Sequence, residues 1–361
     1  MKRLISSVAL AAGVGFVLAS HAAKADPFPD YHLLQTIPVP SSATEWDYVT
    51  YDPATKQLFV GHVDDGVEVF DTANGFKMTK LAGATPSGGV VLIPGFGLGV
   101  AHIDTGSFEV FKTSDLSVIK TFKVGPELDS AVYDPVNHII IPVGANVDDD
   151  KGQDRLDLYS VPDFNKVGSV TVPDPDLEHA VADGQGNIFV NGQKTGHVFK
   201  IDLKSQSIVA TYPTTGCLQP TGMDYNQATH RLFIACRGKI ENPKFIVMNA
   251  DDGSIVYSAP ISADNDGVAF DPKNGNIFVT DGVGPAMFIF HDDGADKYSL
   301  TEVVSTSAYE KTLALNIDDN LVYTIAAEGV IDPHKHIKPK NSHFYANEWV
   351  PNTFAIRVYG Q

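Results

Sequence analysis

Acidic, amide, histidine and arginine side chains recur at matching positions along the 361-residue chain, next to short apolar segments. Carboxylate and amide oxygens are ligands for hard divalent cations, and histidine adds a nitrogen ligand or a hydrogen bond for a polar ligand. The residues with this potential are Glu45, Asp47, His62, His102, Asp129, Glu178, His179, Arg237, Asp266 and Glu310. Asp and Asn also satisfy the backbone of ordinary turns, so each of them taken alone has a structural explanation.

The segments that carry these residues are copies of one pattern. Each copy is a short apolar strand, a turn rich in Asp, Asn, Pro and Gly, and a second strand rich in β-branched or aromatic residues, as in VTYDPATKQLFVGH (49–62). The turn positions lie 41 to 49 residues apart, at Asp52, Ile93, Asp134, Asp183, Asn226, Asp271 and Asn316. Repeats of about 40 to 45 residues, with two further strands in each, are typical of β-propeller blades.

The first and last strands of the pattern complete each other. The seventh repeat has a third strand, FAIRVYG (354–360), and lacks an outer one. The segment YHLLQTIPVP (31–40) has the outer-strand pattern and precedes the first repeat. Pairing these two segments closes a ring and removes an exposed sheet edge. The sequence therefore predicts an all-β protein whose single domain, 26–361, is a seven-bladed β-propeller of four-stranded blades, with the last blade closed by the N-terminal strand.

In such a blade, the loop that enters the first strand and the loop that joins the second and third strands lie at the same end. The candidate side chains therefore converge on one mouth of the central channel. Cys217 precedes the first strand of the fifth repeat and Cys236 ends its second strand, so the two cysteines face each other. In an exported protein this arrangement predicts a disulfide. A redox pair or a pair of metal thiolates is the alternative, although the C-x-x-C spacing typical of them is absent.

One loop departs from the repeat, between the second and third strands of the last blade. It covers 328–353 and is long enough to fold over the channel mouth. The loop carries three lysines and is rich in histidine and aromatic residues, and long structured loops often carry function. We expect a lid over an anionic or carbohydrate-like ligand, a surface for a partner, or simple packing against neighbouring loops. His334 and His336 share one face of an extended segment and so offer two metal ligands.

The first 25 residues have the features of a secretory signal peptide: a basic start, an apolar stretch and an A-x-A cleavage motif that ends at Ala25. Their removal takes away Lys2, Arg3 and Lys24 and no acidic residue, which changes the net charge from −18 to −21. Such an acidic protein is a poor partner for nucleic acid or anionic lipid, whose phosphates require Lys and Arg. No later segment is long and apolar enough to span a bilayer. We expect a periplasmic or secreted monomer.

The chain resembles the exported YVTN-type or YncE-like β-propellers of bacteria over nearly all of its mature length. The resemblance lies in the motifs YDP…LFV, C…PTG…D…RLF…CR, DGVAFDP…G.IFVTDG and IAAEG…PNTFAIRVYG. The paired cysteines around PTGMDYN (220–226) are its most specific element. The resemblance implies a seven-bladed fold and a periplasmic or secreted location. It implies no catalytic residues, because the family has no common established reaction.

Two classes of function stay open, and the sequence favours the first. In the first, the protein is a non-catalytic module that binds a small ligand or a periplasmic protein through its charged mouth and the 328–353 loop. In the second, it is a metal-dependent hydrolase or lactonase of the gluconolactonase type, in which calcium or zinc polarises a lactone carbonyl. Motifs for c-type haem (C-x-x-C-H) and for a serine nucleophile (G-x-S-x-G) are absent. The ligands available for a metal ion are Glu45, Asn146, Asn191, Asp266 and Asp281.

Overall fold

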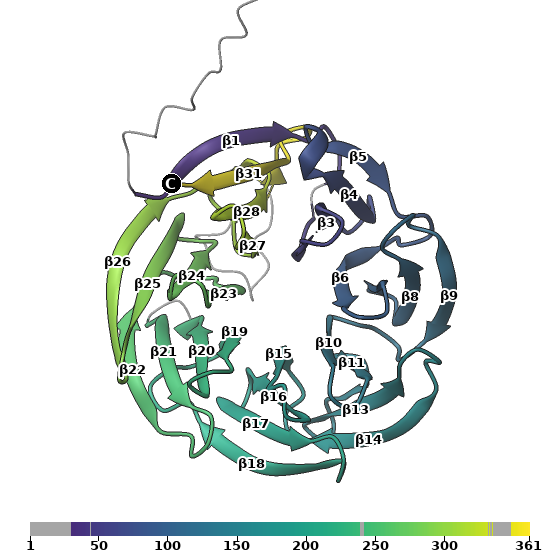
Figure 1. Cartoon of the computed structure of the whole chain (residues 1–361), viewed down its shortest axis with the longest axis vertical. Helices are drawn as coiled ribbons and strands as arrows, with labels where there is room; N and C mark the ends of the chain where they lie inside the picture. Colours follow the sequence, from purple (N-terminus) through teal and green to yellow (C-terminus); the bar gives the residue numbers. More distant parts are fainter. Residues whose placement is uncertain (1–29, 44, 239–241, 331, 333, 335–347) are drawn as a thin grey trace, which may run out of the picture.

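In the computed structural model, β-sheets are arranged radially around a central axis (Figure 1). The structure describes residues 30–43, 45–238, 242–330, 332, 334 and 348–361. These residues form seven antiparallel blades with four main strands each, a short two-stranded ribbon and the 3-10 turn η1. The predicted seven-bladed β-propeller is confirmed. No helix in the described part of the chain has the length and apolar character needed to cross a membrane.

Blades one to three follow one another along the chain, and each runs from its innermost strand outward. Blade one contains β2 (Val49–Asp52), β3 (Gln57–Gly61), β4 (Val67–Asp71) and β5 (Lys77–Lys80), with the 3-10 turn η1 (Thr72–Asn74) before β5. Blade two contains β6 (Ser87–Ile93), β7 (Leu98–Ile103), β8 (Ser107–Lys112) and β9 (Val118–Lys123). Blade three contains β10 (Ser130–Asp134), β11 (Ile139–Val143), β13 (Gln153–Ser160) and β14 (Lys166–Val172), and the short β12 (Val147–Asp148) pairs with β13.

Blades four to six have the same order. Blade four contains β15 (Leu177–Ala182), β16 (Asn187–Gly192), β17 (His197–Asp202) and β18 (Ser207–Pro213). Blade five contains β19 (Pro220–Asn226), β20 (Arg231–Cys236), β21 (Lys244–Asn249) and β22 (Ile255–Pro260). Blade six contains β23 (Gly267–Asp271), β24 (Asn276–Asp281), β25 (Ala286–Gly294) and β26 (Lys297–Ser305).

Blade seven is assembled from both ends of the described chain (Figure 1). Its inner strands are β27 (Leu313–Asn316), β28 (Leu321–Ala326) and β31 (Ala355–Gly360), and its outer strand is β1 (His32–Pro38). β1 lies antiparallel to β31, from His32 opposite Gly360 to Pro38 opposite Ala355. The predicted closure of the ring by the N-terminal strand is confirmed.

The turn residues of the repeat serve the backbone. Asp52, Asp134, Asp183 and Asp271 are buried, and the carboxylate of each accepts a hydrogen bond from the backbone N–H two or three residues further along. Turns of this kind are what Asp and Asn side chains stabilise best. These residues lie at the turns between first and second strands, which is the end of the blade opposite to the predicted mouth.

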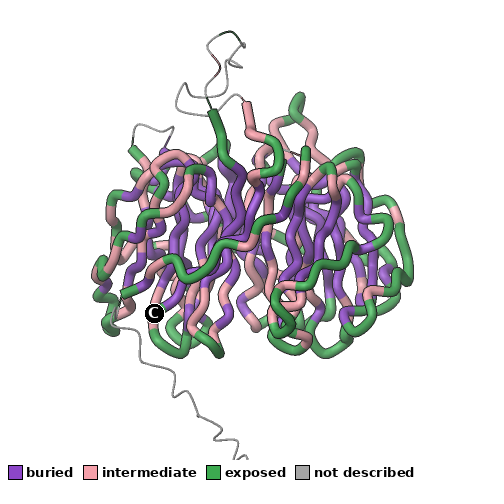
Figure 2. The backbone as a smooth tube through the Cα atoms, turned by 90° about the horizontal axis from the view of Figure 1, so that it is seen from above, coloured by how far each residue is buried: buried purple, intermediate pink, exposed green. Residues whose placement is uncertain are grey.

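Apolar side chains between neighbouring blades form the core. Within the described residues, seven buried clusters each take side chains from two adjacent blades. Phe59 of blade one contacts Phe111 of blade two, with ring centroids 5.6 Å apart. Figure 2 shows the buried strands inside the ring wall and the exposed loops on both faces. Because both faces of each blade are covered, its middle strands are continuously apolar rather than alternating.

Cys217 and Cys236 form a disulfide, as predicted, with Cα atoms 5.5 Å apart. The bond joins the loop before β19 to the end of β20, and both side chains are fully buried. Cross-linking two residues 19 positions apart restricts the unfolded chain, which stabilises the fold by about 3 kcal/mol in the chain-entropy model. The bond also fixes the backbone from which the next residue, Arg237, projects.

Candidate functional site

A cavity of about 530 Å³ opens at one mouth of the central channel. Its walls come from loops that enter innermost strands and from loops that join second and third strands, as the repeat pattern predicts. Seven carboxylates and one lysine line it. We call this surface the acidic mouth; it consists of Asp47, Asp104, Glu127, Leu128, Asp129, Gly144, Val147, Asp149, Pro175, Asp176, Leu177, Glu178 and Lys194.

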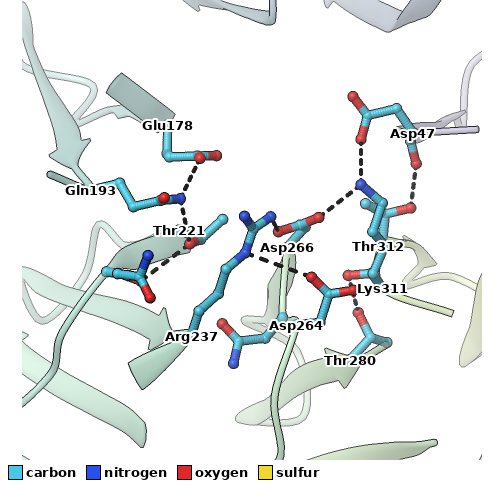
Figure 3. A network of polar contacts seen from close by, with 12 residues as sticks. Asp47, Glu178, Gln193, Thr221, Arg237, Asp264, Asp266, Thr280, Lys311 and Thr312 are labelled. Atoms are coloured by element: carbon cyan, nitrogen blue, oxygen red, sulfur yellow. Dashed lines mark hydrogen bonds and ion pairs between the residues drawn. The ribbon is translucent and has the colours of Figure 1, made fainter. Parts of the chain in front are cut away.

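Two cations lie on the inner side of the acidic mouth (Figure 3). Lys311, before β27, places its Nζ 3.2 Å from Asp47 Oδ1 and 2.9 Å from Asp266 Oδ2. Arg237, after β20, donates a hydrogen bond to Asp266, and its Nε lies 3.8 Å from Asp264 Oδ1. Asp266 is only 5% exposed and is the shared partner of both cations. We call these five residues the ion-pair network.

In the loops before β23 and β27, neighbouring residues send their side chains to different places. Neighbouring side chains on extended backbone point to opposite sides. Lys311 belongs to the network, whereas Glu310 is fully buried inside blade seven. Asp266 belongs to it as well, whereas Asn265 is fully buried and donates its amide to the backbone carbonyls of Cys236 and Ser262. Of two consecutive residues, one therefore places its side chain at the channel and the other supports the surrounding structure.

Glu178, on β15, forms the opposite wall of the acidic mouth (Figure 3). Its Oε1 accepts a hydrogen bond from the side-chain amide of Gln193, which also donates to the hydroxyl of Thr221 at 3.4 Å. Burial raises the pKa of Glu178 well above its ordinary value. The positive charge of Arg237 opposes this rise, and the nearby carboxylate of Asp129 adds to it. Glu178 is thus a carboxylate that gains from an additional cation.

The surroundings of the mouth shift the pKa values of Asp129 and Asp266 in opposite directions. Asp129 keeps an exposed surface, but the protein atoms packed around its carboxylate raise its pKa to about 7, and the charge of Asp47 adds to the rise. Burial also acts against the ionised form of Asp266, but Arg237 and Lys311 outweigh it and hold the pKa of Asp266 below its ordinary range. Negative charge is therefore compensated at Asp266 and under-compensated at Asp129.

Tyr48, His102 and His179 line a second cavity of about 260 Å³, further along the channel. The ring of Tyr48 lies 5.8 Å from that of His102 and 6.0 Å from that of His179, measured between centroids. Burial lowers the pKa of each histidine to about 4, so both are neutral at pH 7. The two histidines therefore add no positive charge to the acidic mouth.

Glu310 was predicted at the mouth, but the structure places it inside blade seven. It is fully buried, and both of its oxygens are occupied. It accepts hydrogen bonds from the backbone N–H of Ser307 and from the hydroxyls of Thr324 and Tyr359, and it forms an ion pair with the guanidinium of Arg357. This arrangement supports the blade and leaves no position for a ligand.

The predicted metal ligands other than Asp266 are also separate from the ion-pair network. Asp281 is fully buried and accepts a hydrogen bond from the backbone N–H of Ser262. Asn191 donates to the backbone carbonyl of Thr221, and Asn146 donates to that of Val124. Glu45 is exposed to solvent. No contact between these side chains places them around one point.

Part of the 328–353 loop is described, at its two ends. β29 (Gly329–Val330) pairs with β30 (Glu348–Trp349). Trp349 contacts Trp46 and Tyr309, with ring centroids 4.7 and 4.6 Å apart. Tyr309 precedes Lys311 by two positions in the sequence, so the base of the loop packs next to the segment that carries Lys311. His334 is exposed, and His336 lies outside the described residues, as do the centre of the predicted lid and the predicted signal peptide. The lid remains a prediction.

Sequence analysis missed Tyr48, Asp104 and Gln193. Asp104 and Gln193 each follow a predicted strand-end residue, His102 and Asn191, by two positions. Side chains two apart on extended backbone share a face. Had the alternation of side-chain direction been continued past the end of the second strand, it would have predicted Asp104 and Gln193 at the mouth.

No family model and no curated protein sequence matches the chain. Solved structures do match. A chain of the crystal structure of the mitotic checkpoint complex has 11% sequence identity and a TM-score of 0.67, over 87% of this chain and 95% of that one. A chain of hydrazine synthase from Kuenenia stuttgartiensis has 15% identity and a TM-score of 0.63, over 86% and 96%. The shared feature is the propeller. At such low identity the fold carries no activity with it, and membership of the YncE-like family stays a prediction.

Proposed function

We propose that this propeller is a binding module that holds a small organic cation, with two or more amino groups, in the acidic mouth. The observation that carries the proposal is the excess of negative charge there: seven carboxylates and one lysine line about 530 Å³. Lys311 and Arg237 compensate the inner side, around Asp266. Asp129 and Glu178 retain raised pKa values, and a bound cation would stabilise their ionised forms.

The size of the acidic mouth favours an extended organic cation over a bare metal ion. A metal ion requires ligand atoms that converge on one point. Among the described residues, acidic and histidine ligand atoms converge in this way at His62, Asp65 and Glu68, which are not part of the acidic mouth. A flexible chain with several ammonium groups can instead form charge-assisted hydrogen bonds with carboxylates spread around a wall. Polyamines have this chemistry.

Titration calorimetry with spermidine tests the proposal. Saturable binding is expected, and Glu178→Gln should weaken it about tenfold, because one hydrogen bond to a charged group contributes about 1.5 kcal/mol. The substitution keeps an oxygen acceptor for Gln193. The affinity should also fall as the pH is lowered from about 8 to 6, because protonation of Asp129, whose pKa is about 7, removes a negative charge from the mouth.

Asp318→Asn is the matched control for Glu178→Gln. Asp318 lies exposed in the turn between β27 and β28, at the opposite end of the ring, and loses the same charge. Its effect on the dissociation constant should be less than about twofold. Absence of spermidine binding, or equal affinity of the wild-type protein and Glu178→Gln, would rule the proposal out.

We also propose that the protein acts in the periplasm or outside the cell. The leader-like residues 1–25 and the buried disulfide support this location, since disulfides persist in oxidising compartments. When the full chain is produced in a bacterial host with two membranes, N-terminal sequencing of the periplasmic fraction should begin at Asp26. The unfolded protein should show no free thiol before reduction. A retained Met1, or two reactive thiols at Cys217 and Cys236, would contradict the proposal.

The metal-dependent hydrolase is the weaker alternative. An ion at Asp266 would have to displace both Arg237 and Lys311, and the side-chain oxygen of Asn146 already accepts a hydrogen bond from Arg155. Elemental analysis before and after chelation distinguishes the two functions: bound metal that Asp266→Ala removes would support the hydrolase.

A further inference from the structure

His62, Asp65 and Glu68 form a compact group in blade one, outside the acidic mouth. His62 follows β3, Glu68 belongs to β4, and Asp65 lies in the loop between them. His62 Nδ1 lies 3.1 Å from Glu68 Oε2 and 3.8 Å from Asp65 Oδ2, and the three ligand atoms are all within 4.8 Å of one another. Tetrahedral zinc, with bonds of about 2.1 Å to nitrogen and oxygen, separates its ligand atoms by about 3.4 Å. The group has the residue types and the spacing of three zinc ligands.

The surroundings of His62 are unusual for a histidine with a purely structural role. Its side chain is fully buried, and its Nε2 has no hydrogen-bond partner among the described residues. Burial of an unpaired polar nitrogen costs free energy. The imidazole stacks on Phe354, with centroids 3.8 Å apart and planes 20° apart, which holds Nδ1 toward the carboxylates. Nδ1 is within hydrogen-bond distance of Glu68, and a metal ion between the two atoms would replace this contact.

Lys80 supplies the positive charge of this group. It lies opposite Glu68 in the pairing of β4 with β5, and its Nζ is 3.0 Å from Asp65 Oδ1 and 3.5 Å from Glu68 Oε1. Its side chain is 46% exposed, so the ammonium group can move into water at little cost. One ammonium leaves two carboxylates with an excess of one negative charge. A divalent cation in its place compensates both carboxylates.

We propose that His62, Asp65 and Glu68 bind Zn²⁺, and that Lys80 is the cation that stabilises the two carboxylates when no metal is bound. Asp65 and Glu68 line a cavity of about 580 Å³, so water or a ligand atom is available as the fourth ligand. The hydroxyl of Ser41 donates a hydrogen bond to Asp65 and thereby orients it, as outer contacts of metal ligands do.

The position of the group gives zinc a structural consequence. Ser41 belongs to the segment that follows β1, and Phe354 directly precedes β31. The zinc ligands therefore contact both sides of the junction at which blades seven and one meet. Because a ligand that binds only the folded state stabilises it, zinc should raise the melting temperature, and above the dissociation constant the rise should grow with the logarithm of the zinc concentration.

Titration calorimetry of the untagged, chelator-treated mature protein with ZnCl₂ tests the proposal. One zinc per chain is expected. Glu68→Gln and Asp65→Asn should each weaken binding by at least about tenfold, whereas Lys80→Gln, which removes the competing ammonium, should strengthen it about tenfold. A melting curve of each variant without zinc checks that the variant is folded. Asp65→Asn is the variant least prone to unfold, because the side chain of Asp65 is partly exposed. Zinc should raise the melting temperature of the wild type and of Lys80→Gln by more than that of the other two variants.

Glu178→Gln separates this site from the acidic mouth. It should bind zinc with the wild-type affinity while losing affinity for spermidine, so failure of one proposal leaves the other intact. Absence of stoichiometric zinc binding by the folded wild type, or unchanged affinity in both Glu68→Gln and Asp65→Asn, would overturn the zinc site. Weaker binding by Lys80→Gln would overturn the role of Lys80 as the competing cation.

Discussion

Replacement of Asp266 by asparagine is expected to lower the free energy of unfolding by about 3 kcal/mol at pH 7. The carboxylate of Asp266 is 5% exposed and is shared by Arg237 and Lys311. Asparagine has nearly the same size and no charge. The variant therefore leaves two cations close together without their common partner, which costs more than the loss of any single contact.

The pH dependence of stability identifies the cause of this loss. Because Arg237 and Lys311 hold the pKa of Asp266 below its ordinary range, the stabilisation is complete above the unfolded-state pKa of about 4 and is lost as the pH falls through the lower folded-state value. Urea unfolding should thus show the largest difference between Asp266→Asn and the wild type near neutral pH, and a smaller one in strong acid.

Asp104→Asn is the control for the Asp266 substitution. It removes a negative charge from the acidic mouth and keeps an oxygen that accepts from the backbone N–H of Gly88. Burial raises the pKa of Asp104, so loss of its charge should leave stability unchanged or increase it. Equal losses of stability in the two variants would contradict the stabilising role of the ion pairs.

Glu310→Gln is expected to have an effect of similar size, about 3 to 5 kcal/mol, inside blade seven. Oε1 of Glu310 forms an ion pair with Arg357 Nε at 3.2 Å, and Oε2 accepts a hydrogen bond from the hydroxyl of Tyr359 at 2.9 Å. Glu310 is fully buried and Arg357 is 8% exposed, so the neutral amide leaves a charged guanidinium in the blade with no carboxylate. Both partners belong to β31, the strand on which the ring closes.

A double variant separates the cost of the charge from the cost of packing. Glu310→Gln with Arg357→Met removes both charges at similar side-chain length, and replacement of a buried ion pair by uncharged groups is often neutral or stabilising. The double variant should recover most of the stability that Glu310→Gln loses, seen as a return of the urea midpoint at a constant slope. If the stability does not return, the cost lies in the hydrogen bonds to Thr324 and Tyr359 rather than in the charge of Arg357.

The ring was predictable from the sequence because its evidence is local and repeated. The YDP turn at Asp134 has the composition of a turn in which a carboxylate accepts a backbone N–H, and the structure contains that bond. The same pattern recurring every 41 to 49 residues defines the blades. The disulfide follows from the placement of Cys217 and Cys236 at facing ends of neighbouring strands.

The site was predictable only in part, because its geometry depends on contacts between blades. Asp47, Asp129, Glu178 and Arg237 lie around the mouth as their loops predict. Glu310 does not, because in the loop before β27 its side chain is buried inside blade seven and the next residue, Lys311, joins the ion-pair network. The sequence also contains no information on which carboxylate each cation contacts, since the ion-pair network joins blades one, five, six and seven, and its pairing depends on the width of the channel.

The pairing of β1 with β31 has a consequence for how the protein folds during its synthesis. β1 is the first of the described strands to leave the ribosome, and β31 is the last. Blade seven can therefore be completed only after β31 has been synthesised, whereas each of the other blades is complete earlier. A product that stops early has two unprotected sheet edges, which invite aggregation and degradation. The last contact to form thus distinguishes finished molecules from unfinished ones.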